Sequence, residues 1–396
     1  MAARVAGARP VADVVRPPAD LLSPCMRLPR GPLPDRSAKL ARQLARVDRA
    51  VGSDPAPLVE LLNQVALVFA EAGEPDRARH VCLAQLDLCA EHHARTADPR
   101  TIVVALQPWV NLGRLRALTG DWAGALPHFG IAAAMTDGTP LRLGPLHIDP
   151  SAWSLVINTV PDAAAVATSL EIADVTKALL RAGRAELLRP WLTRWLANPD
   201  ARTRPILLEA RIVYGLFLRR WTDAGRLAAA GRARADATPF LRLVFGYHEL
   251  LADAGAEAHA VDGLIERGRR LADAVAGLVG AAATTPYDGA RLTAELADLL
   301  GRLGADRDAA TLLDAAAGMA AAEPDEPLHA RLLLRLRAAE PADGRADDAL
   351  RELCGRSEYA EVRRRSHGPS GCRVDHGPPS FLDELDARLR DMPARR

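Results

Sequence analysis

The stretch from Trp109 to Ala132 holds the spacing that most constrains how this chain folds. Aromatic, aliphatic and small residues recur every three or four positions on both sides of a Gly120-Asp121 pair. This is the period of an α-helix, and the Gly-Asp pair marks a break between two helices. The segment therefore predicts a hairpin of two antiparallel helices, which approach closely where Gly113 faces Ala125.

The same pattern recurs along the chain. Further turns of this kind are expected at Gly73, Gly183, Arg219, Gly255 and Gly304. The pattern resembles the tetratricopeptide repeat, whose signature is an aromatic residue and Leu-Gly in the first helix, then Ala, an aromatic residue and Ala in the second. The resemblance covers roughly residues 57 to 320. It implies an all-α fold, a right-handed solenoid of antiparallel helical hairpins.

Composition agrees with helices, and the balanced charge means that any charged partner must be bound through local contacts. Hydrophobic residues make up 49% of the 396 residues and aromatic residues only 4%, which favours close-packed helices rich in Ala and Leu. Lys and Arg number 51 against 50 Asp and Glu, so no net field attracts nucleic acid or a membrane surface. Lysine occurs only at Lys39 and Lys177, and with the abundant Ala, Gly and Pro this indicates a GC-rich coding genome. We expect a bacterial source.

Targeting and membrane signals point to the cytoplasm. No run reaches the ~20 apolar residues that a membrane-spanning helix needs, and the N-terminus lacks the apolar core of a secretory signal. The five cysteines form no CxxC pair. We expect a soluble cytoplasmic protein without membrane contact. Homo-oligomerisation stays open.

Three regions are expected along the chain. They are a flexible Pro/Arg-rich leader at 1–36, the helical array at 37–355 and a flexible tail at 356–396. The array contains an insert at about 136–162, which fits an irregular loop, a short hairpin or one extra helix. Within the tail, Ser380 and Asp383 form a capping-box pattern that predicts a terminal amphipathic helix at 380–392.

Motifs for catalysis and cofactors are missing from the sequence. It has neither a GxxxxGK[ST] phosphate loop nor a GxGxxG after a strand, so no nucleotide cofactor is expected. His248-Glu249 begins an HExxH-like run, but position 252 is Ala, so the second zinc ligand is missing. No catalytic residue is assigned, and we expect the chain to be non-catalytic.

Two groups of Cys and His residues are candidate metal ligands. Cys82, Cys89 and His93 share one helical stripe, with His80 and His92 nearby, but residues on a single helix cannot surround a metal. Packing of small thiols in the helix core is the favoured explanation for these residues. The second group supplies the sulfur and nitrogen ligands of a structural zinc, although its spacing contains no CxxC or HxxxH pair. Its members are Cys354, His367, Cys372 and His376.

The resemblance implies that the first helix of each hairpin lines a concave binding surface. On this basis the residues that bind a partner are expected to be Asn63, Gln107, Asn111, Arg114, Lys177 and Arg181, with Arg242 and Glu249 further along. Asn and Gln side chains can bond a peptide backbone, and Arg or Lys can hold a carboxylate. These positions fit ordinary solvated helix faces equally well.

We therefore expect a scaffold or adaptor that binds a protein or peptide partner, with nucleic-acid binding disfavoured. One alternative is a regulatory component similar to the helical sensor arrays of bacterial transcription activators, acting through another protein. The other is an enzyme or small-molecule-binding protein, in which the 136–162 insert forms a lid and His147, Asp149 and Trp153 contact the ligand.

Overall fold

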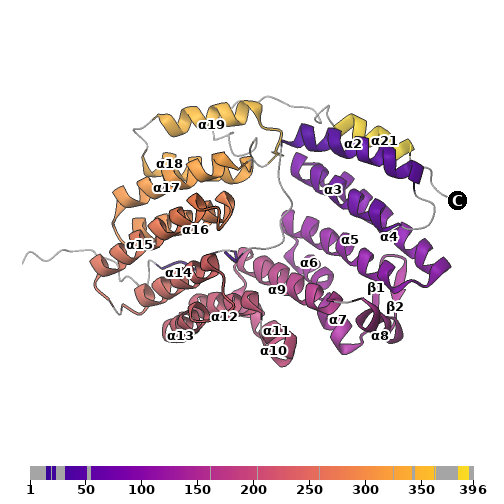
Figure 1. Cartoon of the computed structure of the whole chain (residues 1–396), viewed down its shortest axis with the longest axis horizontal. Coiled ribbons are helices and arrows are strands. Elements are labelled where there is room, and N and C mark those ends of the chain that lie inside the picture. The colour runs from indigo at the N-terminus through magenta and orange to yellow at the C-terminus, as the bar shows by residue number, and fades with distance from the viewer. Residues whose placement is uncertain are drawn as a thin grey trace, which may run out of the picture. The chain divides into compact units, whose positions relative to one another are not determined.

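The fold is described by a computed structural model, and its described residues are predominantly helical (Figure 1). The described residues are 15–18, 20–23, 32–50, 55–160, 162–202, 204–257, 259–323, 325–340, 344–360, 362 and 382–391. Their helices pack mainly against the neighbours that precede and follow them in the sequence, which confirms the all-α prediction. The chain divides into two compact units: unit 1 comprises residues 1–28 and 179–353, and unit 2 comprises 29–178 and 354–396.

Unit 2 contains the first and last helices of the described chain. Its elements are α2 (Leu33–Ala50), α3 (Ala56–Ala72), α4 (Pro75–Thr96), α5 (Pro99–Leu118), α6 (Trp122–Phe129), α7 (Ile131–Asp137), β1 (Leu141–Leu143), β2 (Leu146–Ile148), α8 (Pro150–Thr159), most of α9 (Ala163–Arg181) and α21 (Leu382–Asp391). Consecutive helices from α2 to α6 are in contact, and α21 packs against α2. Leu382 and Leu385 of α21 are fully buried. The terminal helix expected at 380–392 is therefore present as α21.

The close approach expected at Gly113 is present between α5 and α6. A Cβ atom added at Gly113 would lie 2.6 Å from Cβ of His128 and 3.2 Å from the carbonyl oxygen of Ala125. Only glycine fits this contact without moving the neighbouring helix. Gly120 lies at the break between the two helices, with φ of 86°.

The other expected turns also coincide with helix ends. The residues with positive φ at these positions are Gly73, Gly183, Arg219 and Gly304, and α14 ends at Gly255. A left-handed backbone conformation is the usual way for a helix to terminate. The breaks predicted from the turn residues are therefore confirmed.

The insert at 136–162 contains a short hairpin and a helix. Strands β1 and β2 pair antiparallel, with Leu141 opposite Ile148. Asp149 then caps α8 by accepting a hydrogen bond from the backbone N–H of Ala152 at 2.8 Å. β2 contacts α4, and α8 contacts α5. Two of the three interpretations, the hairpin and the extra helix, thus apply together.

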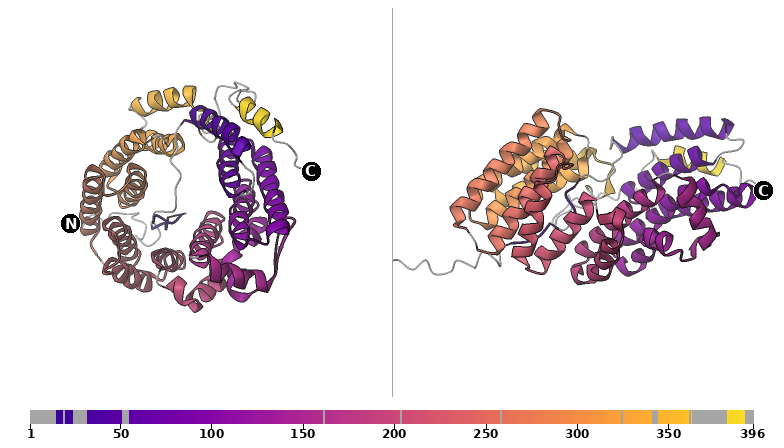
Figure 2. Two further views of the ribbon diagram at one scale, coloured as in Figure 1. Left: turned by 45° about the vertical axis from the view of Figure 1, so that its right-hand side comes forward. Right: turned by 60° about the horizontal axis from the view of Figure 1, so that its bottom comes forward.

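Unit 1 is a succession of helices and contains part of the N-terminal segment. Its helices are the end of α9, η1 (Ala185–Leu187), α10 (Leu188–Ala197), α11 (Pro199–Arg202), α12 (Pro205–Phe217), α13 (Trp221–Arg232), α14 (Pro239–Gly255), α15 (Val261–Gly280), α16 (Pro286–Arg302), α17 (Asp306–Ala322), α18 (Glu326–Ala339) and most of α19 (Arg345–Arg356). Figure 2 shows α12 to α18 side by side in sequence order. Alternate helices also touch, α12 with α14 and α14 with α16, so these three form one layer.

A short N-terminal segment lies against this layer. We call residues 15–18 and 20–23 the strap; they have neither helical nor strand structure. Leu21 is 1% exposed and Leu22 is 3% exposed. Val15 and Leu22 belong to the same hydrophobic core as residues of α12, α14 and α16. The range 1–36, expected to be a flexible leader, thus contains buried residues and also the first turn of α2, while 1–14, 19 and 24–31 lie outside the described residues.

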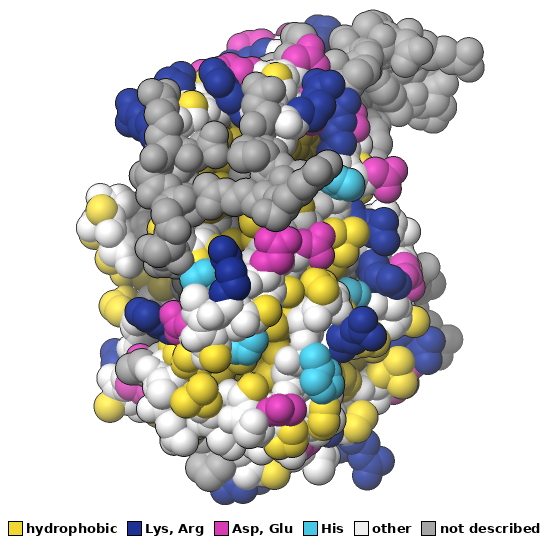
Figure 3. Space-filling model, turned by 90° about the vertical axis from the view of Figure 1, so that its right-hand side faces the viewer, with side chains coloured by type: hydrophobic (Ala, Val, Ile, Leu, Met, Phe, Trp, Pro, Cys, Tyr) yellow, Lys and Arg dark blue, Asp and Glu magenta, His cyan; other side chains and the backbone are white. Residues whose placement is uncertain are grey.

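Within the described ranges, no single helix is long and apolar enough to cross a membrane, whereas α8 and α9 together, bent by 109° at their break, meet the criteria of length and composition. Figure 3 shows basic and acidic side chains interspersed among hydrophobic ones on the face that it draws. This mixture agrees with the net charge of +1.

Candidate functional site

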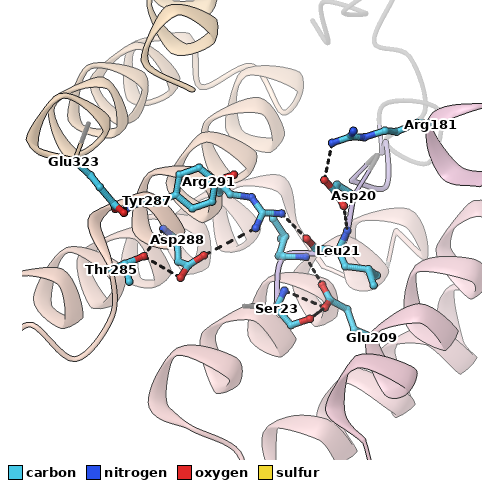
Figure 4. A network of polar contacts seen from close by, with 11 residues as sticks. Asp20, Leu21, Ser23, Arg181, Glu209, Thr285, Tyr287, Asp288, Arg291 and Glu323 are labelled. Carbon is cyan, nitrogen blue, oxygen red and sulfur yellow. Dashed lines mark hydrogen bonds and ion pairs between the residues drawn. The ribbon is translucent and has the colours of Figure 1, made fainter. Parts of the chain in front are cut away.

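The buried carboxylate of Glu209, on α12, binds two consecutive residues of the strap (Figure 4). Its Oε1 atom accepts a hydrogen bond from the backbone N–H of Leu22 at 2.6 Å. Its Oε2 atom accepts one from the backbone N–H of Ser23 at 3.0 Å and another from the Ser23 hydroxyl. Glu209 is fully buried, and a buried carboxylate is tolerated only when donors of this kind compensate its lost hydration.

His248, on α14, also contacts the Glu209 carboxylate. Its Nε2 atom lies 3.2 Å from Oε1 of Glu209, and its ring is fully buried. Burial raises the pKa of Glu209, but hydrogen bonds from His248, Ser23 and Leu22 outweigh burial and hold the pKa below its usual value. Glu209 is therefore charged at neutral pH, and Nε2 of His248 carries the proton that it donates.

Arg291, on α16, binds the strap backbone as a hydrogen-bond donor, whereas Glu209 binds it as an acceptor. Its guanidinium donates a hydrogen bond to the carbonyl oxygen of Leu21. The same group lies 5.6 Å from the ring centroid of Tyr287 and 4.0 Å from the carboxylate of Asp288. Asp288 is itself held by the Thr285 hydroxyl, which donates to it at 2.9 Å. Arg291 thus reaches the strap from a fixed position.

The strap also makes one ion pair at the edge of unit 1. Arg181, at the end of α9, lies 2.8 Å from the carboxylate of Asp20, and the two side chains are 39% and 27% exposed. Arg181 was expected to hold a carboxylate of a partner, and here it holds one of its own chain. Four successive strap residues, 20–23, are therefore contacted by α9, α12 and α16, with His248 of α14 behind Glu209.

In unit 2 a second set of polar residues joins neighbouring helices. Nε2 of Gln107 donates to Oδ1 of Asn111 at 3.1 Å, and Nδ2 of Asn111 donates to Oδ1 of Asn63 at 3.3 Å. Arg114 donates to the same Asn111 oxygen at 3.2 Å. Asn63 lies on α3 and the other three on α5. The structure therefore brings together four of the six residues expected to bind a partner.

Residues on α4 and α9 extend this set. Gln85 donates to Oδ1 of Asn63 at 2.9 Å, and Arg114 forms a bidentate pair with Asp174, at 3.2 and 2.9 Å. The Arg114 side chain is 40% exposed, so part of the set meets solvent. Lys177 lies on α9, one turn beyond Asp174. We call Asn63, Gln85, Gln107, Asn111, Arg114 and Asp174 the polar chain.

The two remaining expected lining residues lie on α14. Arg242 is exposed, and Glu249 pairs with Arg232 of α13 at 3.2 Å.

A cavity of about 260 Å³ lies beside the polar chain in unit 2. Its lining is mostly apolar and includes Leu106, Val110, Phe129, Ile131, Val166 and Leu170. Gln107 and Asp174 of the polar chain complete it, with Glu171. The residues expected to contact a small molecule lie elsewhere: His147 is exposed on β2, Asp149 caps α8, and Trp153 donates to the carbonyl of Thr139 at 2.9 Å.

The candidate metal groups find no support among the residues that the structure describes. No cluster of three or more His, Cys, Asp or Glu residues is placed to hold a metal there. Cys82 and Cys89 are fully buried, and burial raises the pKa of both thiols to about 12. They are therefore protonated at neutral pH and poor as nucleophiles or ligands. Of the C-terminal group only Cys354 is described; His367, Cys372 and His376 lie outside the described residues.

The strap site rests on residues that the sequence pattern did not select. Glu209, Arg291 and Gln85 were not candidates, and His248 was considered only as part of an incomplete zinc motif. One signal was available: Glu209 interrupts the apolar run "ILLEARIV", where helical spacing places it towards the core, and a buried carboxylate requires partners. No protein-family model and no curated protein matches the sequence.

Proposed function

We propose that this protein is a non-catalytic scaffold or adaptor with a tetratricopeptide-like helical array, which binds peptide segments of a protein partner. The observation that carries the proposal is the binding of the strap backbone by Glu209 and Arg291. One side chain accepts from two successive N–H groups, and the other donates to the preceding carbonyl. Helix side chains that bond the backbone of a non-helical segment are the contacts that a peptide-binding surface requires.

The repeat architecture also supports the proposal. Helix ends at the expected turn positions and the close contact of Gly113 with Ala125 agree with stacked helical hairpins. Such an array places its first helices on one surface. The polar chain joins α3, α4, α5 and α9 of unit 2, and its amide groups can exchange their mutual hydrogen bonds for those of a peptide backbone.

A display library of random peptides, selected on the immobilised full-length protein, tests this function. We expect enrichment of peptides whose binding is lost in N111A or R114E, because these changes remove an amide or reverse a partly exposed charge of the polar chain. The matched control is R116E on the same helix, whose side chain is 51% exposed and pairs with Asp121. Failure to enrich any peptide, or enrichment that N111A and R114E leave unchanged, contradicts peptide binding by unit 2.

The cavity favours a second candidate function, the binding of a small apolar molecule by unit 2. Its volume of about 260 Å³ and its aliphatic and aromatic lining suit a compact hydrophobic ligand. An environment-sensitive hydrophobic dye tests this candidate. We expect its fluorescence to rise with the native protein and to fall with V110W or L106W, which fill the cavity, whereas an unchanged signal in both variants excludes the site.

A further inference from the structure

We infer that the strap is an internal ligand, which occupies the peptide site of unit 1 until a partner segment of the same chemistry displaces it. This role rests on the proposed function and adds to it both the recognition sequence and its regulation. The partner segment carries, in order, an acidic residue, two large aliphatic residues and a residue with a hydroxyl group. In the strap these are Asp20, Leu21, Leu22 and Ser23.

Each position of this sequence follows from a contact. Arg181 pairs with the Asp20 carboxylate at 2.8 Å, so an acidic side chain is favoured there. Leu21 and Leu22 are 1% and 3% exposed, so both positions need apolar side chains. The Ser23 hydroxyl donates to Glu209, and an alanine would leave that buried carboxylate oxygen with one donor fewer. Threonine keeps the donor.

The contacts also explain how the strap can leave. Side chains of α9, α12 and α16 contact strap residues 20–23. Because the strap is neither a helix nor a strand, its departure does not break a ladder of backbone hydrogen bonds. Because the strap is covalently attached, its effective concentration at the site is on the order of millimolar. The apparent Kd of a free partner is therefore its intrinsic Kd divided by the small fraction of sites that the strap has left.

Ser23 gives a direct way to weaken the strap. Ser23→Asp places a second carboxylate against the buried Glu209, where like charges repel. Ser23→Thr retains the hydroxyl and serves as the matched control. A labelled synthetic peptide with the sequence of residues 15–23, VRPPADLLS, is then titrated into the full-length wild type, S23T and S23D, with binding followed by fluorescence anisotropy.

We expect S23D to bind the peptide at least about tenfold more tightly than the wild type and S23T. The same peptide carrying S23D in its own sequence should not bind, because it meets the same repulsion at Glu209. Equal affinity of the wild type and S23D for the peptide overturns the inference.

Hydrogen exchange provides a measurement on the unaltered protein. Excess VRPPADLLS should accelerate exchange of the Leu22 and Ser23 amides of the wild type, because displacement exposes both N–H groups to water. Unchanged protection at saturating peptide overturns the inference even if S23D does not fold. If neither assay shows binding of VRPPADLLS while the binding of displayed peptides still depends on Asn111, the inference fails and the proposed function stands. If the display selection also yields no peptide that binds, both the inference and the proposed function fail.

Discussion

Glu209 and Ser23 lie 186 residues apart in the sequence and are joined by two hydrogen bonds to a single carboxylate oxygen. One comes from the Ser23 backbone and would be available to any residue except proline. The other comes from the hydroxyl and distinguishes serine from an aliphatic residue. The buried Glu209 carboxylate thus recognises both the strap backbone and the hydroxyl side chain at position 23.

Replacing Glu209 by Gln should destabilise unit 1. In the wild type, Leu22, Ser23 and His248 donate to the two charged oxygens of Glu209. The glutamine amide offers these donors a single acceptor oxygen and carries no charge. Charge-assisted hydrogen bonds of this kind contribute about 1.5–3 kcal/mol each, so we expect E209Q to lower the free energy of unfolding by about 2–3 kcal/mol. Chemical denaturation of the full-length protein measures it. The control E186Q changes a glutamate that is 56% exposed and should leave the free energy of unfolding nearly unchanged.

Acid should release the strap. The pKa of Glu209 lies below its ordinary value of 4.5, so its contribution is fully present above pH 4.5 and is lost as the pH falls through the lowered pKa. The amide resonances of Leu22 and Ser23 report the release in a pH titration by NMR. The same acid transition in E209Q would assign it to another group.

Gly113→Ala should weaken the packing of α5 on α6. The added methyl group meets Cβ of His128 at 2.6 Å and Cε1 of Phe129 at 2.8 Å, closer than carbon atoms approach without strain. We expect a loss of about 1–3 kcal/mol in unfolding free energy. G318A, within α17, has no neighbour within 4 Å of the added methyl group and should gain about 0.5–1 kcal/mol from helix propensity. Equal thermal shifts for the two variants would contradict the close contact.

The described cysteines should differ sharply in reactivity. Cys82 and Cys89 are fully buried with pKa values of about 12, whereas Cys354 is partly exposed. In a variant that carries C25S and C372S, we expect Cys354 to react with a disulfide reagent in the native state and the other two thiols only after unfolding. Fast modification of all three in the native protein would show that α4 opens readily.

The helices and their breaks could be predicted because their causes are local. A glycine at Gly120 or Gly304 ends a helix through its own backbone conformation, with φ of 86° at both positions. The contact of Gly113 with Ala125 also follows from spacing within one hairpin. Part of the polar chain could be predicted as well, because the repeat assigns Asn63 and Asn111 to equivalent faces of α3 and α5.

The strap site could not be predicted in this way. Residues 1–36 show no helical or strand period, so the apolar pair Leu21-Leu22 gave no indication of what covers it. Glu209 signalled that a partner was needed, but a single sequence does not say which of its many N–H groups would supply the hydrogen bonds. Contacts between residues so distant in sequence depend on the completed packing of α12, α14 and α16.

The position of the strap in the sequence also imposes an order on biosynthesis. The 186 residues that separate Ser23 from Glu209 take about 10–40 s to translate at roughly 5–20 residues per second. During that interval the Leu21-Leu22 pair has left the ribosome and its binding partners have not yet been made. α21 follows α2 only after the whole of unit 1 in the sequence, yet the two helices pack together, so this contact also waits for distant residues. The nascent polypeptide therefore exposes the apolar surfaces of the strap and of α2 until the helices that cover them have been synthesised.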